Sequence, residues 1–139
     1  MISHIHHINF LVRDLAPAVE KHRRLLGIEP IYESLPGRGV ETARFDVGGT
    51  WVVFVQPTGD EGVPARHLKT HGEGVFLLSY GTDDLETCLE GLERQGIPQT
   101  SGSARRGLSD WRVTDVGEEG GVVLQVAEEV GGGKKGSGG

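Results

Sequence analysis

Histidine is the residue type best suited to chemistry in this chain of 139 residues, which carries 6 of them. The imidazole of His7 could act as a general acid or base, because its free pKa lies near neutrality. It could also anchor a ligand carbonyl, or only pack. His4 and His6 have a spacing that can chelate a metal, but beside the start of the chain we expect them to be solvated. His7 is therefore the candidate catalytic residue.

Amides, an aromatic residue and arginines supply the remaining polar chemistry. Asn9 and Gln125 could hydrogen-bond a ligand or each other, and Trp51 could stack on a ligand or fill the core. Three arginines could pair with a carboxylate or phosphate or remain solvated: Arg105, Arg106 and Arg112. Cys88 lies on an apolar helical face and is predicted to be buried in the core.

Composition excludes several classes of protein. The formal net charge of −6 argues against a nucleic-acid partner. A single cysteine excludes an intramolecular disulfide and a cysteine-based zinc site. No apolar run is long enough to span a membrane and no leader opens the chain, so we expect a cytoplasmic protein.

The apolar pattern repeats itself along the chain. It predicts strands at 5–12, 29–34, 40–47, 50–56, 74–80, 97–100, 111–116 and 121–127. Helices capped by Asp14 and Asp84 are expected to end at Gly27 and Gly96. Each half is thus a strand, a helix and three strands. We expect the first module at 1–60, a linker at 61–73, the second module at 74–128 and a disordered tail at 129–139.

Strand parity divides the side chains between two faces. The residues expected to pack on the helices include Phe10, Phe54 and Val126. The opposite faces should line a mostly apolar cleft, which suits a small organic ligand. The ligand-binding residues predicted there are Asn9, Trp51, Val53, Leu77, Ser79 and Gln125, beside His7.

These motifs resemble those of a known family, the vicinal oxygen chelate superfamily of glyoxalases, bleomycin-resistance proteins and extradiol dioxygenases. The resemblance rests on the sequences of residues 7–15, 26–30, 40–48, 55–58, 72–75 and 120–125. The closest pattern is that of the methylmalonyl-CoA epimerases. It implies an α+β fold in which two βαβββ modules form a curled eight-stranded mixed sheet around a cleft, and it implies a homodimer.

The resemblance also implies four metal-ligand positions, which fall on His7, Val53, Leu77 and Gln125. Valine and leucine offer no donor atom, so we predict no metal site and no cofactor. The leading hypothesis is a metal-independent isomerase or lyase that binds a small organic molecule and uses His7. The alternatives are a metal-dependent isomerase, lyase or dioxygenase with unexpected ligands, and a non-catalytic drug-binding resistance protein.

Overall fold

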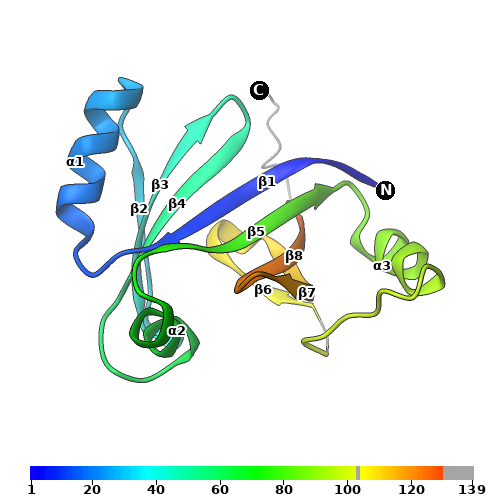
Figure 1. Ribbon diagram of the computed structural model, residues 1–139. Helices are drawn as coiled ribbons and strands as arrows, with labels where there is room; N and C mark the ends of the chain where they lie inside the picture. Colours follow the sequence, from blue (N-terminus) through cyan, green and yellow to red (C-terminus); the bar gives the residue numbers. More distant parts are fainter. Residues whose placement is uncertain (103, 130–139) are drawn as a thin grey trace. The chain divides into compact units, whose positions relative to one another are not determined.

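The computed structural model describes residues 1–102 and 104–129, and it follows a strand–helix–three-strand order twice (Figure 1). Within those residues it contains eight strands and three helices. They are β1 (Ile2–Leu11), α1 (Leu15–Leu26), β2 (Ile31–Leu35), β3 (Val40–Val47), β4 (Thr50–Pro57), α2 (Val63–His71), β5 (Gly74–Thr82), α3 (Leu85–Arg94), β6 (Arg105–Arg106), β7 (Arg112–Glu119) and β8 (Val122–Glu128).

The strands form a mixed sheet with the hydrogen-bonding order β2-β3-β4-β1-β5-β8-β7-β6. β1 with β4 and β5 with β8 pair in parallel, and the hairpin neighbours pair antiparallel. The predicted α+β class with an eight-stranded mixed sheet is therefore confirmed. The chain divides into an N-terminal unit, His7–Phe76, and a C-terminal unit made of Met1–His6 and the chain from Leu77 onward.

In the N-terminal unit, α1 covers one face of its strands. The side chain of Asp14 accepts a hydrogen bond from the Ala16 N–H at 3.3 Å, and Gly27 ends the helix in the left-handed conformation. The buried core between helix and strands is built from Val19, Ala43, Phe45 and Phe54, with Phe10 and Val52 packed against it. The predicted parity of β1 and β4 is therefore confirmed at Phe10, Val52 and Phe54.

In the C-terminal unit, the N-terminus of α3 is also capped by an aspartate. Asp84 accepts hydrogen bonds from the backbone N–H and hydroxyl of Thr87, and these bonds lower the pKa of its carboxyl group. Leu85 and Cys88 of the helix pack on Val126 of β8. Cys88 is thus a core residue, as predicted.

One segment of the second module differs from the sequence expectation. The strand predicted at 97–100 is absent, and the short strand of this module is β6, Arg105–Arg106. Pro98 has no N–H to donate to a ladder, and the Ile97 N–H instead bonds to the Leu92 carbonyl at the end of α3. The stretch 61–73, expected to be the linker between the modules, contains α2, with Pro64 in its first turn.

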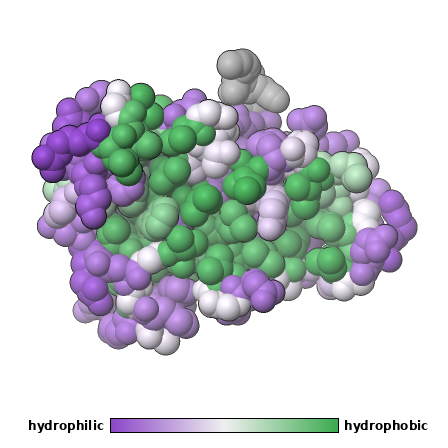
Figure 2. Space-filling model, turned by 45° about the horizontal axis from the view of Figure 1, so that its top comes forward, coloured by the Kyte–Doolittle hydropathy of each residue, from purple (hydrophilic) through white to green (hydrophobic). Residues whose placement is uncertain are grey.

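Part of the apolar surface remains outside the cores, and Figure 2 shows hydrophobic residues gathered on the face that it presents. The exposed apolar side chains include Leu25, Ile31 and Tyr32 in the N-terminal unit, and Ile2 and Ile97 in the C-terminal unit. Among residues 1–102 and 104–129, no helix has the length and hydropathy needed to cross a bilayer. The predicted disordered tail falls outside the described residues beyond Glu129.

Candidate functional site

Four of the predicted site residues share one face of the N-terminal unit. In the parallel ladder His7 pairs with Trp51 and Asn9 pairs with Val53, so their side chains point to the same side. Because the alternate residues of β4 pack on α1, this side faces away from the helix. We call it the N-terminal site face. His7 and Val53 are buried there, whereas Asn9 and Trp51 are half-buried.

A buried arginine, which the sequence analysis did not select, lies on the same face. Arg44 is the register partner of Val53, and only 6% of it is exposed. Its Nη1 donates to Glu33 Oε1 at 2.7 Å, and the guanidinium lies 5.2 Å from the centre of the Trp51 ring. The signal was available, because Val40, Thr42 and Arg44 alternate with Ala43 and Phe45 along β3. Arg44 gives this face a charge that Glu33 balances.

The other three predicted site residues share a face of the C-terminal unit. Leu77 and Ser79 of β5 stand in register with Val123 and Gln125 of β8, on the side that faces away from the Val126 core. We call this the C-terminal site face. Leu77, Ser79 and Gln125 are all buried, with exposed fractions of 6%, 0% and 3%.

Three buried oxygens of these seven residues have no hydrogen-bond partner among residues 1–102 and 104–129. They are Asn9 Oδ1 on the N-terminal site face, and Ser79 Oγ and Gln125 Oε1 on the C-terminal site face. A buried acceptor without a partner costs about 1–3 kcal/mol, so folded proteins keep few of them. All three belong to the predicted site residues, but no sequence pattern shows whether a side-chain oxygen is paired in the folded chain.

The amide of Gln125 is hydrogen-bonded to Asp115, the carboxylate of a charged pair with Arg105. Its Nε2 donates to Asp115 Oδ1 at 3.3 Å, and Arg105 Nη2 donates to the same oxygen at 3.2 Å. The Asp115 backbone N–H donates to Ser101 Oγ at 3.0 Å. Asp115 therefore fixes the orientation of the Gln125 amide, and Arg105 balances its charge.

The three arginines considered as anion ligands are all engaged with carboxylates of the chain. Arg105 pairs with Asp115, Arg106 with Asp110, and Arg112 with both Glu86 and Glu128. The hydrogen bond from Arg112 lowers the pKa of Glu86, and the hydrogen bond to Glu86 raises the pKa of Arg112.

The expectation that His4 and His6 are both solvated is wrong for His6. His4 is exposed, but only 2% of His6 is exposed. Its Nε2 lies 2.8 Å from Glu129 Oε2, and its ring meets the Trp111 ring edge-on, with the centres 4.5 Å apart. His4 belongs to the same strand β1, so the burial of His6 comes from Trp111 and Glu129, which pack against its ring from far along the chain.

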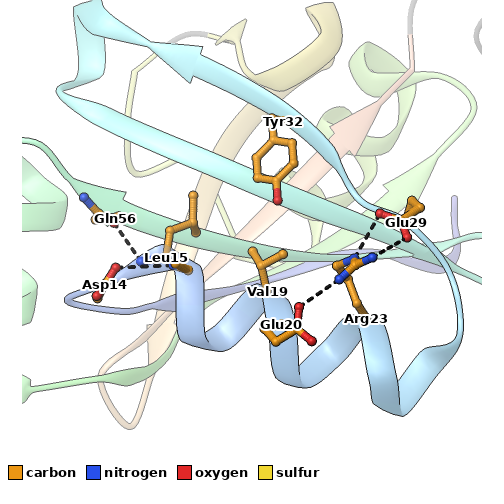
Figure 3. Close-up of a pocket in the computed structure, with 9 residues that line it drawn as sticks. Asp14, Leu15, Val19, Glu20, Arg23, Glu29, Tyr32 and Gln56 are labelled. Atoms are coloured by element: carbon orange, nitrogen blue, oxygen red, sulfur yellow. Dashed lines mark hydrogen bonds and ion pairs between the residues drawn. The ribbon is translucent and has the colours of Figure 1, made fainter.

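One pocket of the N-terminal unit lies on the helix side of the strands (Figure 3). Its volume is about 660 Å³, and none of its lining residues is a predicted site residue. Three ionic or polar contacts lie along its wall: Arg23 donates to Glu29 and to Glu20, and the Leu15 N–H donates to Gln56 Oε1. The hydrogen bond from Arg23 lowers the pKa of Glu29. These paired groups make the pocket a structural groove along α1.

The metal positions implied by the resemblance do not fit a divalent ion. A catalytic site needs about three protein donors, and Val53 and Leu77 supply hydrocarbon at two of the four positions. Among residues 1–102 and 104–129, no cluster of three His, Cys, Asp or Glu side chains is arranged to hold a metal. We therefore derive no chemical step through a metal ion.

Comparison with solved structures shows the fold. A methylmalonyl-CoA epimerase from Mycobacterium tuberculosis has a TM-score of 0.84 at 24% identity, covering 94% of this chain and 90% of that one. A variant of the Streptomyces coelicolor methylmalonyl-CoA epimerase, in complex with 2-nitronate-propionyl-CoA, has a TM-score of 0.81 at 25% identity over 92% and 95% of the two chains. A methylmalonyl-CoA epimerase in complex with methylmalonyl-CoA and NH4+ has the same values.

A search among curated proteins found no sequence match. The family model described as Glyoxalase/Bleomycin resistance protein/Dioxygenase superfamily matches residues 6–114. This match covers both βαβββ segments up to Thr114 and agrees with the fold. The chain therefore belongs to the glyoxalase, bleomycin-resistance and dioxygenase superfamily.

Proposed function

We propose that this protein binds a small organic molecule through buried polar side chains set in otherwise apolar strand faces. The observation that supports it is the set of unpartnered buried oxygens of Asn9, Ser79 and Gln125. Each face also offers hydrocarbon to a ligand bound there, from Val53 on the N-terminal site face and from Leu77 on the C-terminal site face. Buried polar groups with unfilled hydrogen bonds in an apolar setting are typical of small-ligand sites.

We further propose that the activity is an isomerase- or lyase-like reaction that needs no divalent metal. His7 is the candidate acid–base group, because a neutral imidazole has one nitrogen that donates and one that accepts a proton. Val53 and Leu77 support the absence of a metal requirement, since neither can ligate an ion.

A second function is favoured by a specific observation, the similarity to an epimerase in complex with methylmalonyl-CoA at 25% identity. On that alternative the chain epimerises an acyl-CoA with the help of a metal. Removal and return of the proton beside the thioester carbonyl would then exchange it with solvent.

The experiment uses propionyl-CoA and methylmalonyl-CoA as probes, in deuterated buffer, with EDTA or with added Co²⁺. Binding is measured by calorimetry and exchange at the carbon beside the thioester by mass spectrometry. We expect binding to be unchanged by EDTA and any exchange to be lost in His7→Gln but kept in the control His71→Gln. Exchange that requires the metal would overturn the metal-independent reaction in favour of the epimerase.

A non-catalytic binding protein is a separate outcome of the same experiment. It is indicated if a probe binds, is recovered unchanged and binds equally well to His7→Gln.

We also propose that the protein is a homodimer, in which the exposed apolar side chains are covered. Light scattering on the purified chain checks that state, and a monomeric mass would contradict it.

A further inference from the structure

We infer that the C-terminal site face recognises a neutral group with an N–H or O–H donor, of the carboxamide or hydroxyl class, and rejects a carboxylate. This inference rests on the proposed function and names the chemistry of the ligand. It concerns Ser79 and Gln125, which stand side by side as register partners of β5 and β8.

The first argument is the orientation of the Gln125 amide. Its Nε2 donates to Asp115 Oδ1, so the opposite orientation would place an amide oxygen against a carboxylate oxygen. The Oε1 atom is thus the free end of the amide, and it is buried without a partner among the residues that the structure describes. A carbonyl oxygen can only accept, so the group that fills this position must donate a proton.

The second argument is the hydroxyl of Ser79. It is fully buried and its oxygen has no partner in the described part of the chain, yet a hydroxyl can both donate and accept. Beside Gln125, it can accept a second donor or donate to an acceptor of the same ligand group. A primary carboxamide carries both functions on one carbon, and an alcohol carries both on one oxygen.

The third argument is charge. The basic group next to this face, Arg105, is already balanced by Asp115. A bound carboxylate would lie against the lone pairs of Gln125 Oε1 and near the Asp115 carboxylate, with no unbalanced cation in these contacts. Burying such a charge without a counter-ion costs far more than burying a neutral amide.

The other residues on this face determine how polar the rest of the ligand can be. Leu77 and Val123 lie two residues before Ser79 and Gln125 along their strands, and Gly81 and Ala127 lie two residues after them. None of these four residues has a polar side chain, but the His4 ring occupies the space over Gly81, so the apolar surface lies at the Leu77 and Val123 end. The donor group is therefore expected to be attached to a compact apolar body.

The test is an NMR titration of the full chain with three small probes of similar shape: isobutyramide, isobutyrate and isobutylammonium. The reporters are the side-chain amide signals of Gln125 and the backbone amide signal of Ser79. We expect isobutyramide to shift these signals with an apparent Kd at least about tenfold lower than that of either charged probe.

Two variants and a control test whether isobutyramide binding depends on the side chains of Ser79 and Gln125. Ser79→Ala and Gln125→Met should each weaken isobutyramide binding about tenfold, followed through backbone signals of β5 and β8. Ser34→Ala removes an exposed hydroxyl that donates to Glu41, and should leave binding unchanged.

The outcomes separate this inference from the proposed function. Tighter binding of isobutyrate or isobutylammonium at these signals would overturn the inference while leaving small-molecule binding intact. Equal effects of Ser34→Ala and Ser79→Ala would also overturn it. If none of the probes shifts these signals and the acyl-CoA probes do not bind, the inference and the proposed function both fail.

Discussion

The two site faces differ in how far their buried polar groups are paired, although Asn9 Oδ1 on the N-terminal site face also has no partner in the part of the chain that the structure describes. On the N-terminal site face, Arg44 is paired with Glu33, and the Thr42 hydroxyl donates to the Glu33 carbonyl at 2.7 Å. On the C-terminal site face, Ser79 Oγ and Gln125 Oε1 have no partner within the described chain. Paired groups stabilise the fold, whereas unpaired ones reduce its stability and remain available to a ligand.

The buried ion pair gives the largest expected effect. Glu33→Ala removes the carboxylate from Arg44, of which only 6% is exposed, and should lower the free energy of unfolding by about 2 kcal/mol. Urea denaturation of the variant and the wild type measures the difference.

Arg44→Met is the matched control for this change. It replaces the buried cation with an apolar chain of similar length and leaves a Glu33 side chain that is 30% exposed and can be hydrated. We expect a smaller loss than for Glu33→Ala. A larger loss would show that Arg44 has a further structural role, and the account of a simply balanced charge would be wrong.

The hydrogen bond of the Thr42 hydroxyl is expected to make the next-largest contribution to the free energy of unfolding. Thr42→Val keeps the branched shape but removes the donor to the Glu33 carbonyl, so the free energy of unfolding should fall by about 1 kcal/mol. Thermal denaturation checks it. An unchanged stability would remove the distinction between paired and unpaired hydroxyls on which the comparison of the two faces rests.

The smallest effect concerns pH and an exposed ion pair of the C-terminal unit. The hydrogen bond from Arg112 lowers the pKa of Glu86 below its ordinary value of 4.5. A carboxyl group whose folded pKa is lowered stabilises the fold above its unfolded pKa, and this contribution is lost as the pH falls through the folded value.

The stability of Glu86→Gln should therefore fall less steeply than that of the wild type between about pH 5 and about pH 3. Glu90, an exposed residue of the same helix, is the control position, and Glu90→Gln should follow the wild-type curve. The difference should shrink at high salt. Parallel curves for Glu86→Gln and the wild type would contradict the role of this pair.

Much of the fold could be predicted from the sequence because side chains alternate along a strand with a period of two. That rule placed Phe54 against α1 and Val126 against α3, and it put Ser79 and Gln125 on one face. Asp14 and Gly27 located the ends of α1, because caps and left-handed glycines act locally.

What the sequence did not reveal depends on residues far apart in the chain. The partner of His6 is Glu129, 123 positions away, and no local pattern links them. Arg44 was overlooked because a charged residue in a strand is more often solvated than buried. The unpaired state of Ser79 and Gln125 is a property of everything around them, and only the folded structure shows it.

The most direct measurement compares Ser79→Ala with the wild type in two respects. Because its hydroxyl is buried and unpaired, its removal should raise the free energy of unfolding by about 1 kcal/mol. The same change should weaken isobutyramide binding about tenfold. A loss of stability like that of Thr42→Val, with unchanged binding, would show that the hydroxyl serves the fold and would contradict the account.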